Sequence, residues 1–123
     1  MNFTRENTSA VSVRRVEPGA IGIGDDTITD NVVIFRDQIE RGITIGPIAD
    51  LAEADLKMIL DETPEIVILG TGWQAQQPSR ELTFAMARRG IGFESMDTPA
   101  ACRTFNILLS EGRDVAAVLL IKD

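Results

Sequence analysis

Residues 66–72 read Ile66-Val67-Ile68-Leu69-Gly70-Thr71-Gly72, an unbroken apolar run that ends in a glycine-rich loop. A short apolar run without polar alternation is typical of a strand that is covered on both faces. The run therefore predicts an α/β domain with at least one strand buried between two layers.

Downstream of this run, the sequence predicts two helices and two further strands. Ser79 and Gly90 bracket the first helix, as an N-cap and a terminating glycine do. The second helix is expected over Thr98–Ser110, and the strands over residues 91–96 and 115–121. The order strand-helix-strand-helix-strand favours parallel pairing through crossover helices.

Upstream, the sequence predicts several short strands and one more helix. The expected strands are residues 20–23, 27–30, 32–35 and 43–45, whereas residues 36–41 are ambiguous. The first two flank the turn residues Gly24-Asp25-Asp26 and so indicate a hairpin. Asp50 and Glu53 have the spacing of a capping box, which predicts the start of a helix there.

These elements predict one globular domain over residues 17–123, preceded by a flexible N-terminal arm over residues 1–16. The expected fold class is α/β: a single three-layer β/β/α domain with a mixed sheet, formed by an N-terminal hairpin and strands and then by β-α-β-α-β. We expect the helices on one side of the sheet and the N-terminal strands to curl over it.

The residue types that are missing exclude several kinds of chemistry. The chain of 123 residues has no histidine, no tyrosine and one cysteine, Cys102. A Ser-His or Cys-His nucleophile pair and the commonest zinc ligand are therefore absent, and no intrachain disulfide can form. The carboxylates around Asp25-Asp26 lack the spacing of a calcium loop. We predict no catalytic residue, no metal site and no cofactor, and an enzyme is the less favoured class.

The sequence also bears on location. No apolar run approaches the roughly 18 residues of a membrane span. The N-terminus lacks the basic and then apolar pattern of a secretory signal, and a lone cysteine fits a reducing compartment. We expect a cytoplasmic protein without membrane insertion.

Charge is distributed unevenly along the chain. The net charge is −7, with −9 over residues 17–65 and 0 over residues 66–123. This balance argues against nucleic acid and against anionic membrane surfaces as partners, because both attract basic faces. The acidic half is either a solvated face or a patch for a basic protein partner.

One candidate site is a crevice between the Gly70-Thr71-Gly72 loop and the N-terminus of the predicted helix Thr98–Ser110. Thr98 is expected to cap this helix, with Pro99 at its first position. Glycine backbone N–H groups and a free helix N-terminus bind anions, and Arg103 lies nearby in sequence. The candidate anion-binding residues are Gly70, Thr71, Gly72, Thr98 and Arg103. A tight turn explains the same glycines without any ligand.

The sequence allows two alternative roles each for Asp97 and Cys102, which lie near the start of this helix. Asp97 is either an acid or base beside the crevice or an ion-pair partner that fills it by binding Arg103. Cys102 is either a thiol activated by the helix N-terminus or a small residue at the edge of the core.

Candidate contacts with a partner are Trp73, Phe84 and Ile107, which the predicted apolar stripes do not use. Aromatic side chains dominate protein interfaces. Trp73 and Phe84 can equally cover the end of the sheet. Ile107, on the Arg103 side of its helix, indicates a contact surface that is either a dimer face or a place where a loop packs.

Several strings of the sequence together resemble one known family. These strings are Gly70-Thr71-Gly72, Arg89-Gly90-Ile91-Gly92, Met96-Asp97-Thr98, residues 101–109 and Glu111-Gly112-Arg113. They resemble the small uncharacterised-domain family that includes the mitochondrial complex I assembly factor 3 and the adipogenesis-associated Mth-domain protein. The resemblance implies a three-layer β/β/α domain, no established catalytic activity and, for the eukaryotic relatives, roles in assembly or scaffolding.

Two functional hypotheses follow. The leading one is a non-enzymatic interaction or assembly-factor-like module whose protein partners belong to a respiratory or membrane complex. The alternative is a protein or enzyme that binds a small anion in the crevice between Gly70-Thr71-Gly72 and the helix Thr98–Ser110.

Overall fold

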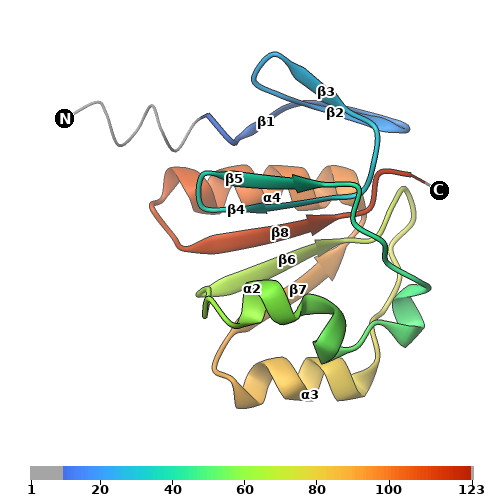
Figure 1. The fold of residues 1–123 in the computed structure, drawn as a ribbon, viewed down its shortest axis with the longest axis vertical. Coiled ribbons are helices and arrows are strands. Elements are labelled where there is room, and N and C mark those ends of the chain that lie inside the picture. Colours follow the sequence, from blue (N-terminus) through green and yellow to red (C-terminus); the bar gives the residue numbers. More distant parts are fainter. Residues whose placement is uncertain (1–9, 123) are drawn as a thin grey trace.

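The computed structural model describes residues 10–122 and contains a mixed five-stranded sheet (Figure 1). Its strands are β4 (Val32–Phe35), β5 (Gln38–Arg41), β6 (Ile66–Gly70), β7 (Gly92–Met96) and β8 (Val115–Leu119). They lie in the order β5-β4-β8-β6-β7. β6 pairs in parallel with both β7 and β8, whereas β4 pairs antiparallel with β5 and β8. The predicted parallel unit and mixed sheet are confirmed.

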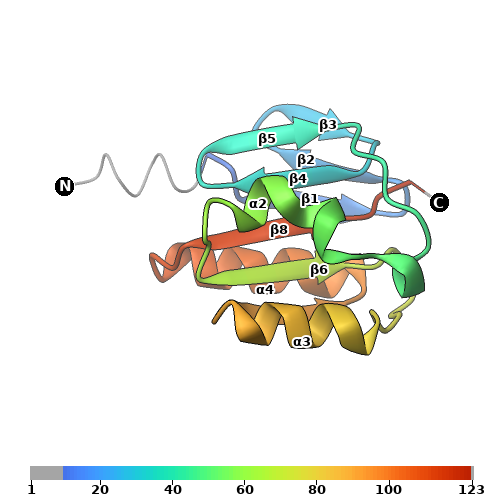
Figure 2. The same ribbon diagram turned by 60° about the horizontal axis from the view of Figure 1, so that its bottom comes forward.

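Two helices connect the parallel strands, α3 (Arg80–Arg88) from β6 to β7 and α4 (Thr98–Ser110) from β7 to β8. β7 and β8 lie on opposite sides of β6, so the second connection runs back across the sheet. Crossovers between parallel strands are right-handed. The connection from β6 to β7 and the connection from β7 to β8 run in opposite directions across the sheet, so α3 and α4 lie on opposite faces. The buried side chains of α3 and α4 indeed belong to different core clusters. Figure 2 shows α4 behind the sheet strands and α3 apart from it. The expectation that the helices share one side is therefore wrong for α4.

A second, three-stranded sheet lies beside α4 on the same face of the main sheet. It consists of β1 (Val13–Glu17), β2 (Ala20–Ile23) and β3 (Asp26–Ile28), paired antiparallel in that order. The predicted hairpin is β2–β3, but Asp26 belongs to β3 instead of the turn, and β3 ends at Ile28 instead of Asp30. The three-layer β/β/α fold class is confirmed, with the difference that α4 shares the outer layer with the small sheet.

The predicted flexible arm over residues 1–16 does not extend as far as residue 16. Residues 13–17 form β1, and the side chains of Val11 and Val13 are buried in the core. Arginines at positions 14 and 15 made this segment look polar, although its apolar residues at 11 and 13 alternate in the manner of a strand. Residues 1–9 lie outside the described residues.

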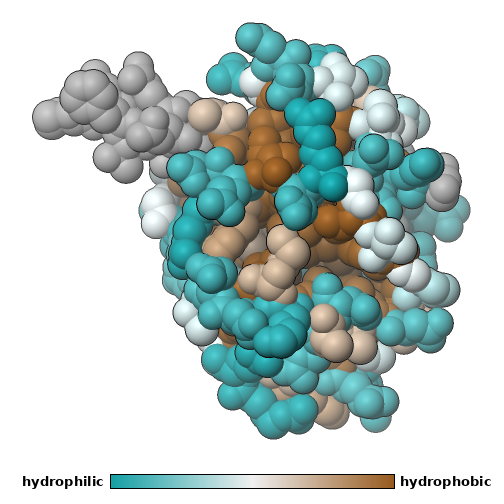
Figure 3. Space-filling model, in the orientation of Figure 1, coloured by the Kyte–Doolittle hydropathy of each residue, from teal (hydrophilic) through white to brown (hydrophobic). Residues whose placement is uncertain are grey.

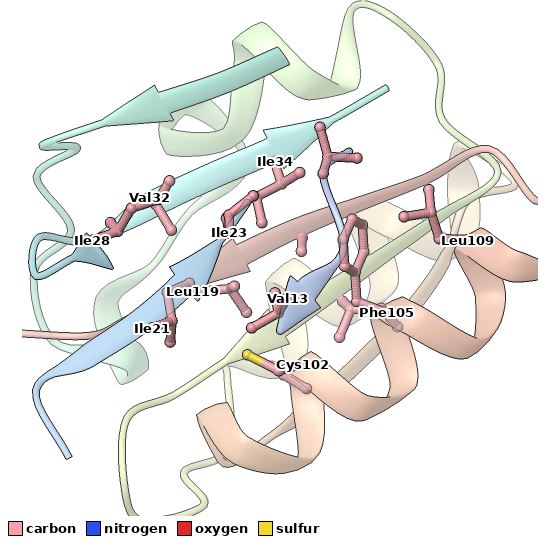
Figure 4. Close-up of a cluster of buried hydrophobic side chains, with 14 of the residues drawn as sticks. Val13, Ile21, Ile23, Ile28, Val32, Ile34, Cys102, Phe105, Leu109 and Leu119 are labelled. Carbon is pink, nitrogen blue, oxygen red and sulfur yellow. The ribbon is translucent and has the colours of Figure 1, made fainter. Parts of the chain in front are cut away.

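The main sheet separates two apolar cores. The first lies between this sheet, the small sheet and α4, and Figure 4 shows Cys102 and Phe105 of α4 on the side of the helix that faces Val13. The second lies under α3 and the segment 48–60.

The segment between β5 and β6 differs from its prediction. Residues 43–45 form no strand, and the helix is split into η1 (Ile48–Asp50), η2 (Glu53–Leu56) and α2 (Lys57–Leu60). The cap is formed by Asp55, whose Oδ2 accepts a hydrogen bond from the Ala52 N–H at 2.9 Å, instead of by Asp50 and Glu53. The spacing i, i+4, i+7 and i+8 predicts an apolar stripe of Ala52, Leu56, Ile59 and Leu60. Leu56, Ile59 and Leu60 are buried, whereas Ala52 is exposed.

The attachment of β1 gives the first prediction. The Asn106 side chain accepts a hydrogen bond from Val13 N and donates one to Val13 O, both at 2.8 Å. Replacing Asn106 with alanine leaves both partly buried backbone groups without this partner, so we expect a loss of about 1–3 kcal/mol in unfolding free energy. Amide hydrogen exchange at Val13 should accelerate more than exchange in β6. Ser110→Ala, an exposed change on the same helix, should leave both quantities unchanged, and equal exchange at Val13 in Asn106→Ala would contradict the prediction.

Candidate functional site

The predicted crevice lies at the carboxyl ends of β6 and β7, where Gly70 and Met96 are register partners. The loops that leave these two strands lead to α3 and α4 on opposite faces of the sheet. In open α/β sheets this is the position at which ligands bind, because diverging loops leave a gap between them. The structure brings Gly70, Thr71, Gly72 and Thr98 together at this edge of the sheet.

Two buried threonines fill this gap. The Thr98 hydroxyl donates a hydrogen bond to Leu120 O at 2.7 Å and accepts one from the Gly72 N–H at 2.9 Å. The Thr71 hydroxyl contacts Met96 O and Gln74 O, while the Thr71 N–H donates to Met96 O. Both side chains are at most 2 % exposed. The chain's own polar groups thus occupy the place where a ligand would bind.

The first turn of α4 has no free N–H group either. Asp97, instead of Thr98, is the N-cap, and its carboxylate accepts a hydrogen bond from Ala100 N at 2.8 Å. The Thr98 N–H donates to Gly72 O, the Ala101 N–H donates to Asp97 O, and Pro99 has no N–H. An anion at this helix N-terminus would need free N–H groups. The N–H groups of Thr98, Ala100 and Ala101 are all engaged in hydrogen bonds within the chain.

The two loop glycines have steric explanations. A Cβ on Gly70 would lie 2.9 Å from Thr98 Oγ1 and 3.1 Å from the Ala101 Cβ, so this glycine lets α4 approach the end of β6. Gly72 has φ +94, a backbone conformation that residues with a side chain rarely adopt. The Gly-Thr-Gly motif is therefore explained by packing and by a turn.

Asp97 and Arg103 are not brought together. Among the ion pairs of residues 10–122 none involves either residue. Arg103 is exposed on α4, and the Asp97 side chain serves as the cap.

Cys102 is a core residue. It is 1 % exposed and lies within the first apolar core. Burial raises the pKa of its thiol to about 12, and the nearby positive charge of Arg103 only partly opposes this effect. The thiol is therefore protonated at neutral pH, which is the state of an inert cysteine.

The three predicted contact residues lie on different parts of the molecule. Trp73 is partly buried against the first core, whereas Phe84 and Ile107 are each 57 % exposed. Phe84 belongs to α3 and Ile107 to α4, so they lie on opposite faces of the main sheet. They do not form one surface.

Sequence reasoning missed Met58, which is also 57 % exposed. It lies on α2, and its position outside the apolar stripe of Leu56, Ile59 and Leu60 was the signal in the sequence that could have identified it.

Met58 and Phe84 border two grooves on the side of the main sheet that carries α2 and α3. The β4–α2 groove, of about 620 Å³, is lined by Val33, Phe35, Glu40, Met58, Ile59 and Glu62 among others. The η–α3 groove, of about 580 Å³, is lined by Asp50, Leu51, Glu81, Leu82, Phe84 and Ala85 among others.

Figure 3 shows this face, where apolar surface lies in hollows between hydrophilic ridges.

Among residues 10–122 no group of three or more cysteine, aspartate or glutamate side chains is arranged to hold a metal ion. In the same range no buried side-chain nitrogen or oxygen lacks a hydrogen-bond partner. The exposed apolar side chains are thus the features that the fold itself does not explain.

Comparison with known proteins places this chain among relatives. The family described as "Protein of unknown function (DUF498/DUF598)" matches residues 13–120. The human NADH dehydrogenase (ubiquinone) 1 alpha subcomplex assembly factor 3 is 38 % identical over 78 residues, which are 62 % of this chain and 42 % of the human protein. The 13 kDa major membrane protein of Francisella tularensis is 32 % identical over 76 residues, 62 % of each chain.

A solved structure from Xanthomonas campestris shares the fold, with a TM-score of 0.81 and 29 % identity over 89 % of this chain and 83 % of that one. The segment of this chain that matches the human assembly factor corresponds to about two fifths of the length of that protein. Within the part of the chain that the structure describes, no helix is long and apolar enough to cross a membrane.

The threonine network gives a stability prediction. Thr98→Val keeps the shape of the side chain but removes the hydroxyl, so the buried Leu120 carbonyl and Gly72 N–H each lose a partner. We expect a loss of about 2–4 kcal/mol in unfolding free energy and a thermal midpoint lower by about 10 °C. Thr98→Ser retains the hydroxyl and should lose clearly less. Equal stability of the valine and serine variants would show that the network contributes nothing.

The buried thiol gives a reactivity prediction. With a pKa of about 12, the native Cys102 thiol should resist alkylation by iodoacetamide at pH 8. The same reagent should modify it readily in guanidinium chloride, because unfolding removes the burial that raises its pKa. Intact-protein mass spectrometry measures both rates, and rapid modification of the native protein would mean that Cys102 is accessible.

Proposed function

The chain belongs to the DUF498/DUF598 family, and we propose on this premise that it is a non-enzymatic, protein-binding module that assists the assembly of a respiratory complex. The human relative is named as an assembly factor of NADH dehydrogenase. That role belongs to a protein more than twice as long as the matched segment. Its transfer to this chain needs support from the surface of this chain.

The observation that carries the proposal is the exposure of Met58 and Phe84 on one face. Each side chain is 57 % exposed although it borders a groove with an apolar floor. Covering a large apolar side chain contributes about 1.5–3 kcal/mol when burial is complete. Two such side chains on one face therefore favour a protein-binding surface.

The alternative of a small-anion site receives no comparable support. The backbone donors of the Gly70-Thr71-Gly72 loop and of the α4 N-terminus already bond within the chain. Arg103 is exposed and one helical turn further along.

The test is genetic complementation in the cells from which the chain comes. Deletion of the gene should lower the amount of assembled NADH dehydrogenase on native gels and lead to accumulation of smaller subcomplexes. The wild-type gene should restore assembly. The Met58→Asp and Phe84→Asp variants should restore it poorly while folding normally, because both side chains are already exposed.

Ile107→Asp is the matched control, since Ile107 is equally exposed but lies on the opposite face. It should restore assembly like the wild type. Normal amounts of the assembled complex after deletion would refute the role in assembly, and a defect confined to Ile107→Asp would move the binding surface to α4.

A further inference from the structure

The helical layer of this fold does not cover the whole of the main sheet. α3 packs against β7, and α2 has only four residues. Neither helix lies over β5 in either view (Figures 1 and 2). Val33 of β4 is buried in the second core, whereas Gln38 and Glu40, its neighbours on the same side of β5, are exposed. This side of β5 is therefore left without a helix.

The uncovered region is the β4–α2 groove. Its floor is formed by Val33 and Phe35 of β4, which face the second core. Its wall is α2, with Met58 57 % exposed beside the buried Ile59. Methionine adapts its shape to different partners, and it is frequent at binding grooves for this reason. The groove therefore offers an apolar strip next to an existing helix.

The rim of the groove is negative. The one cation among its lining residues, Arg36, is bonded to Glu62 at 3.1 Å and to Asp114 at 3.3 Å. Glu40 lies on β5 directly opposite Val33, and Asp37 lies in the hairpin turn. Neither carboxylate has an ion-pair partner among residues 10–122. A ligand with positive groups beside an apolar face would match this arrangement.

We propose that the β4–α2 groove binds a basic amphipathic helix of a protein partner, which lies beside α2 and extends the helical layer over β5. This inference rests on the proposed function and names the kind of partner segment involved. The apolar side chains of the helix, spaced at i, i+3, i+4 and i+7, cover Met58 and the exposed part of Phe35. Lysine or arginine side chains at its flanks approach Glu40 and Asp37.

The negative charge of the rim favours a basic helix over two other possible occupants of the groove, a second copy of the chain and an anionic bilayer. A second copy of the chain, bound through the same patch, would bring the Glu40 and Asp37 carboxylates of both copies together. A bilayer of anionic lipid would be repelled by the same groups. A positively charged helix is attracted by them.

The experiment is site-specific photo-crosslinking in cells of the source organism. A photo-reactive phenylalanine analogue replaces Met58 in one strain, Phe84 in a second and Ile107 in a third, three positions with equal exposure. Mass spectrometry then identifies the crosslinked peptide. We expect position 58 to crosslink one protein segment that has a net positive charge and helical apolar spacing, and position 107 not to crosslink that segment.

A synthetic peptide of the crosslinked segment then tests the role of charge. Glu40→Lys should weaken its binding by about fivefold to tenfold in fluorescence anisotropy, because a rim attraction becomes a repulsion. Glu94→Lys is the matched control, since Glu94 is also exposed but lies on the other edge strand, β7. It should bind like the wild type.

Four outcomes would overturn the inference: no crosslink at position 58, a crosslink to an acidic segment, a crosslink to lipid, or a crosslink to a second copy. Equal binding by Glu40→Lys and the wild type would also overturn it. These results are independent of the deletion experiment. An assembly defect without a crosslink at position 58 would refute the groove alone, whereas a basic helix crosslinked in cells that assemble the complex normally after deletion would refute the assembly role alone.

Discussion

Burial of β6 and β8 on both faces is the constraint on which the rest of the structure depends. The β8 side chains alternate between the two cores, with Val115, Ala117 and Leu119 in the first and Ala116 and Val118 in the second. A strand with two apolar faces needs a covering layer on each. α4 and the small sheet form one layer, and α3 with the segment 48–60 forms the other. The second layer does not reach the edge strand β5, whose Gln38 and Glu40 are exposed beside α2.

The same strand order determines how the loops after β6 and β7 are arranged. Right-handed crossovers in opposite directions separate the loops after β6 and β7 and so create the gap in which many α/β proteins bind ligands. Here the buried side chains of Thr71 and Thr98 lie in the gap, and Gly70 lets α4 approach the end of β6 within contact distance. The Thr98 hydroxyl connects the loop after β6 to the end of β8 by accepting a hydrogen bond from Gly72 N–H and donating one to Leu120 O. The edge where fold analogy places a ligand is closed by polar groups of the chain itself.

The sequence predicts those parts of the fold that depend on local patterns. The bounds of α4 and the Ser79 cap of α3 follow from capping residues and helical spacing, and both are confirmed. The faces on which helices lie depend instead on strand order, which no local pattern encodes, and this is why α4 was placed on the wrong side. The hydrogen bonds of the Thr98 hydroxyl join it to residues 26 and 22 positions away in sequence, and no local pattern predicts contacts of that range.

Arg36 shows how one residue determines both the shape and the charge of the β4–α2 groove. Its φ of 59 lies in the left-handed region, at a hairpin-turn position that favours glycine. An arginine there costs about 1–2 kcal/mol in backbone strain, which its side chain can offset through contacts that glycine lacks. Its guanidinium group lies 4.4 Å above the Phe35 ring and bonds to Glu62 and Asp114. The groove thus keeps an apolar floor with its one lining cation already neutralised, and the charges of Asp37 and Glu40 remain for a partner to meet.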